Sequence, residues 1–114
     1  MIEKHLDLKV LSALREFMAD EYPALLDTFL KDSEERLQAL RTSGDASQLI
    51  DAAHSFKGSS SNMGAVRLAE LCHELEQQAR EANPATLEQL VGAIDSEFAQ
   101  VRPLYQAERE RFHC

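Results

Sequence analysis

One short segment of the sequence combines side chains that are suited to group-transfer chemistry. His54 is followed by Lys57 three residues later, by Gly58 four residues later and by Ser61 seven residues later. On a helix these spacings bring side chains onto or next to one face. A neutral imidazole is a competent nucleophile near pH 7, and an ammonium group can offset negative charge that develops during transfer. The pattern therefore indicates a reactive patch centred on His54.

The apolar pattern of the same segment predicts that His54 points to solvent. The inward face of the helix is marked by residues at helical spacing, namely Leu49, Ala53, Phe56 and Ser60. His54 falls roughly 120° from this face. Gly58 costs about 1 kcal/mol relative to alanine inside a helix. Either Gly58 and the serines permit tight packing within the protein, or they leave a bare surface for another macromolecule. The second interpretation suits Gly58 and Ser61, which point with His54.

The motif His54-x-x-Lys57-Gly58-x-x-x-x-x-Gly64 resembles the signature of histidine-containing phosphotransfer (HPt) domains, here of the free-standing bacterial type. The resemblance covers roughly residues 22 to 101. It implies that His54 accepts a phosphoryl group from an aspartyl phosphate of one receiver domain and passes it to an aspartate of another. The implied partners are receiver domains of hybrid sensor kinases and response regulators. Such a receiver would bring the Mg²⁺, so we expect no cofactor and no metal site in this chain.

The residues around His54 receive roles from the motif and from their positions on the predicted helices. We expect Ser55, Gly58, Ser61 and Gly64 to form the partner-binding surface, and Lys57 to assist transfer. Glu76 is assigned by counting along a helical hairpin: His54 lies 11 residues before Ala65 and Glu76 lies 11 after it. The two should therefore stand level on antiparallel helices. A carboxylate that accepts a hydrogen bond from Nδ1 would leave Nε2 free to attack. The alternative is an ordinary exposed glutamate.

Helical periodicity runs through most of the chain and defines the elements that must position these residues. We expect Asp7 to Met18 to form a short helix and Pro23 to Arg41 a longer one. A third, capped by Asp45 or Ser47, should run to Gly64, and a fourth should follow at once and close at Ala82. A fifth should begin with Asn83 as cap and Pro84 in its first turn, and should kink or end at Pro103. Residues 104–114 should form a separate short helix or fray. Short connections join antiparallel neighbours, so the predicted fold is an all-α, antiparallel four-helix bundle with the short N-terminal helix across one end.

Length and composition exclude several classes of protein. The 114 residues suit a single domain, 1–114. A net charge of −8 opposes association with nucleic acid or an anionic membrane surface. The longest uncharged stretch has nine residues, whereas a membrane span needs about 20. With no secretory signal at the start, we expect a cytoplasmic monomer.

Other candidate groups give weaker signals. Glu70-x-x-His73 matches half of a di-iron ligand pattern, but a single copy indicates an exposed helix face. Cys72 falls on an apolar face and should be a buried, unreactive thiol. His5 and His113 have no partner motif, and we assign them no role.

Kinase functions are disfavoured as alternatives to the carrier, and an adaptor function remains. No phosphate-binding loop is present, so we expect neither ATP binding nor autokinase activity. The dimerising hairpin of a sensor kinase would need an attached ATP-binding domain, for which 114 residues leave no room. The main alternative is a helical adaptor that docks a receiver-like partner without phosphoryl chemistry.

Overall fold

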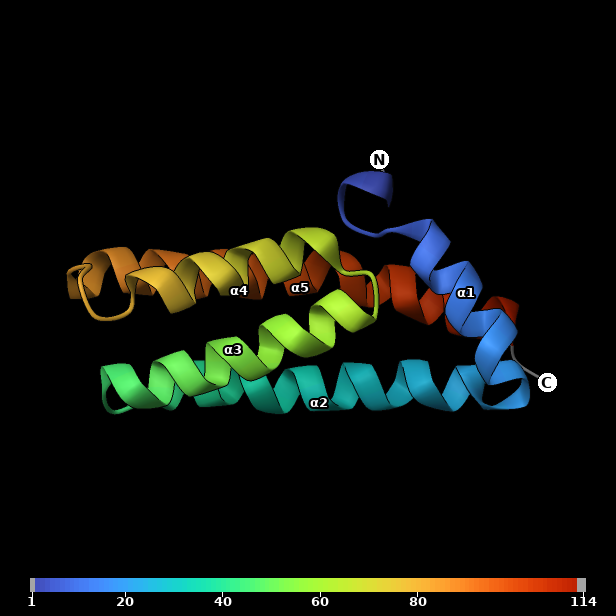
Figure 1. Ribbon diagram of the computed structural model, residues 1–114, viewed down its shortest axis with the longest axis horizontal. Helices are drawn as coiled ribbons and strands as arrows, with labels where there is room; N and C mark the ends of the chain where they lie inside the picture. The colour runs from blue at the N-terminus through green and yellow to red at the C-terminus, as the bar shows by residue number, and fades with distance from the viewer. Residues whose placement is uncertain (1, 113–114) are drawn as a thin grey trace.

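A computed structural model describes residues 2–112 and shows a bundle of helices without any strand in that range (Figure 1). The α-helices are α1 (Leu8–Met18), α2 (Tyr22–Thr42), α3 (Ala46–Asn62), α4 (Val66–Gln78) and α5 (Pro84–Arg111). Two single turns of 3₁₀-helix, Ile2–Lys4 and Ala19–Glu21, flank α1. The molecule measures 46 × 25 × 19 Å. The predicted all-α fold is confirmed.

The four helices α2 to α5 form the bundle around one apolar core. Helices α3 and α4 pack closely as a hairpin, and α2 and α5 pack against them and against each other. Figure 1 shows that α2 and α5 extend beyond the α3–α4 turn, and that α1 crosses this end. The core includes a fully buried side chain from each bundle helix: Leu26, Phe56, Leu68 and Ile94. The position of α1 across one end of the bundle agrees with the position expected for the short N-terminal helix (Figure 1).

Two helix starts follow the expected capping residues. The Asp45 carboxylate accepts a hydrogen bond from the backbone N–H of Gln48, and Asn83 caps α5 in the same way, with Pro84 in the first turn. The expected end of the fourth helix at Ala82 was wrong, because α4 ends at Gln78 and a turn fills the space before α5.

Pro103 was expected to kink or end the fifth helix, and the end is not found, since α5 continues to Arg111. Proline removes one backbone donor, which leaves the carbonyl of Ala99 without its helical partner. Both residues are exposed, so water can satisfy that carbonyl. Beyond the proline, Tyr105 is fully buried and donates a hydrogen bond of 2.6 Å to the backbone oxygen of Met63. Packing therefore outweighs the local cost of the proline.

The N-terminal segment is anchored more firmly than its sequence indicates. Leu6 is buried, and His5 Nδ1 lies 2.6 Å from Oε2 of Glu97, a largely buried carboxylate of α5. No sequence motif reveals this partner of His5, because Glu97 lies 92 positions away in the chain. The other histidine without an assigned role, His113, lies outside the described residues.

Candidate functional site

His54 lies in the middle of α3 and points away from the core. Its neighbours Ala53 and Phe56 are fully buried, whereas 68% of the His54 side chain is exposed. The periodic apolar face of α3 thus fixes the outward direction of the imidazole, as the sequence predicts. Exposure leaves the ring accessible to a partner protein.

Glu76 on α4 links His54 to Lys57. One carboxylate oxygen, Oε2, lies 2.8 Å from Nδ1 of His54, and the other, Oε1, lies 2.7 Å from Nζ of Lys57. The Glu76 side chain is only 19% exposed. The hydrogen bond from Lys57 lowers the pKa of Glu76, and that from His54 contributes too, against the opposing effect of partial burial. Glu76 is therefore a carboxylate near neutral pH, and the hairpin count correctly placed it level with His54.

This contact has a direct consequence for the imidazole. A carboxylate only accepts hydrogen bonds, so Nδ1 must carry the proton in the contact with Glu76. In the neutral ring the other nitrogen, Nε2, then keeps its lone pair. The arrangement orients one ring nitrogen toward the protein and leaves the lone pair of the other on a largely exposed ring.

Lys57 also contacts His73, a second residue of α4, to which the sequence pattern assigned no role. Its Nζ lies 3.5 Å from Nδ1 of His73, which was expected to be only part of a solvated helix face. The same hairpin count could have found this contact, since Lys57 lies eight residues before Ala65 and His73 eight after it. His73 is exposed, so its position beside Lys57 is set by the helix pairing rather than by burial.

The surface beside Gly58 is hollow. Gly58 is exposed, and a β-carbon built on it would meet nothing within 4 Å. Tight packing inside the bundle therefore does not explain this glycine. An open hollow of about 470 Å³ lies between α3 and α4, and Gly58, Ser61 and Lys57 line it together with His73. Ser61 is exposed on this side of His54, as expected from its spacing.

The structure separates the remaining two residues of the expected surface. Ser55 is exposed next to His54, and its hydroxyl accepts a hydrogen bond of 3.1 Å from Nε of Arg36 on α2. No pattern in the sequence indicates that Arg36 lies here. Gly64 does not lie with the others: it is buried in the α3–α4 turn, at a φ of 75°, and its backbone oxygen accepts a hydrogen bond from Asp7. Its assignment to a partner-binding surface is therefore corrected to a role in the turn.

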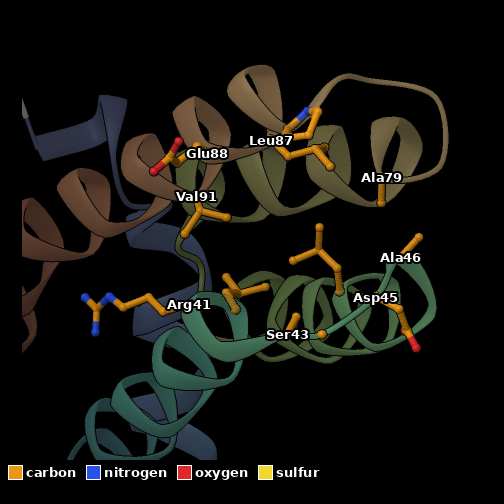
Figure 2. A pocket seen from close by; sticks show the side chains of 12 residues that line it. Arg41, Ser43, Asp45, Ala46, Ala79, Leu87, Glu88 and Val91 are labelled. Carbon is orange, nitrogen blue, oxygen red and sulfur yellow. The ribbon is translucent and has the colours of Figure 1, made fainter.

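A second hollow, of about 600 Å³, lies at the end of the bundle away from the α3–α4 turn. Figure 2 shows it between the α2–α3 connection and the start of α5, with Ser43, Asp45 and Ala46 on one side and Leu87 and Val91 on the other. His54, Lys57 and Glu76 do not line this hollow. It is thus separate from the histidine cluster.

Three other features of the described residues bear on function: metal-ligating clusters, membrane spans and thiols. Within residues 2–112, no group of three or more His, Cys, Asp and Glu side chains could hold a metal ion. In the same range, no helix is long and apolar enough to cross a membrane. Cys72 is fully buried, and burial raises the pKa of its thiol to about 12. The predicted burial of Cys72 is therefore confirmed.

Together these features define a small helical-bundle protein that presents one oriented imidazole to other macromolecules. Comparison with known proteins identifies its family. Residues 24–103 match the model of the Hpt domain family, and the chain therefore belongs to that family. Because this match spans most of the chain, the family resemblance inferred from the His54 motif is confirmed.

Individual relatives agree with this assignment. The crystal structure of histidine-containing phosphotransfer protein B (HptB) from Pseudomonas aeruginosa PAO1 superposes with a TM-score of 0.90 at 53% identity, covering 96% of this chain and 97% of that one. Phosphorelay protein LuxU of Vibrio vulnificus strain YJ016 is 29% identical over 85% of this chain and 87% of its own length. Chemotaxis protein CheA of Listeria monocytogenes is 34% identical over 61% of this chain, but only 14% of that longer protein is matched.

The biochemical role follows from the family and these relatives. The protein is a histidine phosphotransfer carrier of a phosphorelay, and it works with receiver-domain partners. It carries a phosphoryl group between proteins and is not an enzyme in the classical sense.

Proposed function

We propose that His54 is the residue that carries the phosphoryl group. The Nε2 lone pair attacks the phosphorus of an aspartyl phosphate on a receiver domain. The bond between phosphorus and the aspartate oxygen breaks, and its electron pair returns to the carboxylate. The product is a phosphoramidate at Nε2. A second receiver reverses these steps, because its aspartate oxygen attacks the phosphorus and the P–N bond breaks. The observation that supports His54 most directly is its exposed ring with Nδ1 2.8 Å from a carboxylate.

Glu76 and Lys57 have distinct roles in this proposal. Glu76 holds the proton on Nδ1 and stabilises the positive charge that the ring gains when Nε2 forms its bond to phosphorus. Lys57, one helical turn from His54, supplies positive charge on the same face for the phosphoryl oxygens. Neither residue forms a covalent bond to the phosphoryl group. Both act through electrostatics and orientation.

The partner surface is built around the bare part of α3. Gly58, Ser61 and Ser55 surround His54 without large side chains, which lets another protein approach the ring closely. We expect the partners to be receiver domains of hybrid sensor kinases and response regulators, which would bring the acidic pocket and its Mg²⁺. The chain then acts in the cytoplasm as a monomeric single domain, 1–114, with neither ATP binding nor autokinase activity.

The test is phosphoryl acceptance by the His54→Gln variant. The protein is incubated with a receiver domain that has been phosphorylated by an acyl phosphate and Mg²⁺, and is then analysed by mass spectrometry. The wild type should gain an acid-labile, alkali-stable adduct on His54, and the variant should gain none while keeping its unfolding midpoint, because an exposed ring adds little to packing. His113→Gln is the matched control and should accept normally. Acceptance by His54→Gln would refute the assignment, and docking without any adduct on the wild type would favour the adaptor function.

A further inference from the structure

His73 is the one histidine in residues 2–112 that the proposed mechanism leaves without a role although it touches the site. It lies on α4, level with Lys57 on α3, and its Nδ1 is 3.5 Å from the Lys57 ammonium. Building on the proposed function, we propose that His73 is a positioning residue for phosphoryl transfer. In its neutral form it accepts a hydrogen bond from Lys57, and together with Glu76 it holds the ammonium group beside His54.

The hydrogen-bonding capacity of Lys57 fits this role. An ammonium group has three N–H donors and no acceptor. Oε1 of Glu76 lies 2.7 Å from Nζ in an ion pair that engages one of these donors, and Nδ1 of His73 is placed to take a second. The third donor is then left for the phosphoryl oxygens. A lysine side chain otherwise samples many rotamers, so a second acceptor restricts the ammonium group to the seam between α3 and α4.

The contact should depend on pH. Histidine is the side chain whose charge ordinarily changes between about pH 5 and 8. Protonated His73 has no lone pair to offer, and its positive charge would repel Lys57. On α4 itself Glu70 and Glu76 lie one turn to either side, and Glu70 is also paired with Arg67 at 3.6 Å. In the contacts described for residues 2–112, Lys57 is the charged group that meets the ring from another helix. Acidification should therefore release Lys57 from His73.

A double-mutant cycle tests the positioning role. Transfer from a phosphorylated receiver to His54 is measured in single turnovers at saturating receiver. We expect His73→Leu to slow transfer about 3-fold, the size of one exposed, weak hydrogen bond. His73→Asn should stay close to the wild-type rate, because its amide oxygen takes the place of Nδ1. In a Lys57→Ala background, which is itself about 10-fold slower, His73→Leu should change nothing further. Gln77→Leu adds the same side chain at an exposed position of α4 and controls for surface changes.

The pH profile provides a readout that a merely structural role would not affect. The ratio of the wild-type rate to the His73→Asn rate cancels every effect of pH that the two proteins share. This ratio should fall about 3-fold between pH 8 and pH 5.5. A flat ratio, or full additivity of Lys57→Ala and His73→Leu, would overturn the role of His73 while leaving His54 as the phosphoryl acceptor. A normal rate in Lys57→Ala would overturn both the role of His73 and the proposed role of Lys57. Absence of an adduct on His54 in the wild-type protein would instead overturn the proposed function.

Discussion

The contact between Glu76 and His54 makes a quantitative prediction about the tautomer of the imidazole. Glu76→Ala removes the acceptor that lies 2.8 Å from Nδ1. A shielded hydrogen bond to a charged group is worth about 1.5–3 kcal/mol. Here 68% of the His54 side chain is exposed, so solvent competes and we reduce the value to about 1 kcal/mol. Because about 1.4 kcal/mol corresponds to a factor of ten, the variant should lose about five-fold in the ratio of the Nδ1–H to the Nε2–H tautomer.

Nitrogen-15 NMR of the His54 ring measures that ratio directly. At about pH 8 a histidine ring is mostly neutral, and the two nitrogens report which one carries the proton. The rate of phosphoryl acceptance should fall by at least the loss of the reactive tautomer, about two- to five-fold, because Glu76 also stabilises the charge that the ring gains on attack. Glu76→Gln should be intermediate, because a neutral amide oxygen accepts a weaker hydrogen bond than a carboxylate does.

A matched variant separates this effect from a general loss of negative charge. Glu74 is an exposed carboxylate on α4, and Glu74→Ala should leave the tautomer ratio as in the wild type. If Glu76→Ala shows an unchanged tautomer ratio, the two side chains do not interact in solution. The orientation argument would then be refuted, and Glu76 would be only a partner of Lys57.

Four further predictions address the surface, the core and the acid response. Gly58→Glu should weaken receiver affinity at least ten-fold, about 1.4 kcal/mol, because it fills open space with a negative charge; normal affinity in titration calorimetry would contradict the bare-surface argument. Tyr105→Phe should lower the free energy of unfolding in urea by about 1 kcal/mol, since its hydroxyl donates to a buried backbone carbonyl; an unchanged midpoint would mean that the bond contributes nothing. In a Cys114→Ser background, Cys72 should resist a thiol reagent at pH 8 until the protein unfolds, because burial raises its pKa to about 12; rapid labelling of the native protein would disprove its burial. The pKa of Glu76 is lowered in the folded state, so the stabilisation that its ionised carboxylate provides is complete above the unfolded-state pKa and is lost as pH falls through the folded-state pKa. Glu76→Gln should therefore be less stable than the wild type at pH 7 and equal to it in strong acid. A difference in stability that persists in acid would show that it does not come from ionisation of Glu76.

Local pattern was enough to predict most of the fold. Each bundle helix carries an apolar face at helical spacing, and the capping residues Asp45 and Asn83 mark two of the starts correctly. The failures occurred where distant contacts decide the outcome. Pro103 would end an isolated helix, but Tyr105 beyond it is held by a residue 42 positions away. No local pattern contains that partner.

The site likewise combines features that local sequence predicts with features that depend on contacts between helices. The direction of His54 and the openness of the surface at Gly58 follow from position on α3 alone. The position of Glu76 follows from one additional assumption, that α3 and α4 form a hairpin around Ala65. The same assumption applies to His73, although its spacing from Glu70 resembles a metal-ligand pattern and does not itself indicate that Lys57 lies opposite. Arg36 beside Ser55 could not be predicted, because the register of α2 against α3 depends on packing along the whole seam.

The register of α3 against α4 is in turn set by the two ends of the chain. Three hydrogen bonds hold the α3–α4 turn: Asp7 N–H to Gly64 O at 2.8 Å, Val66 N–H to His5 O at 3.1 Å, and Tyr105 O–H to Met63 O at 2.6 Å. A β-carbon on Gly64 would lie 3.0 Å from the oxygen of Asp7, so the close approach requires glycine. A shift of the turn by one residue would displace the two helices by about 1.5 Å each in opposite directions. That displacement exceeds the tolerance of the 2.8 Å contact between His54 and Glu76. The final glycine of the motif thus supports the site from a distance, because it fixes the turn from which His54 and Glu76 are counted.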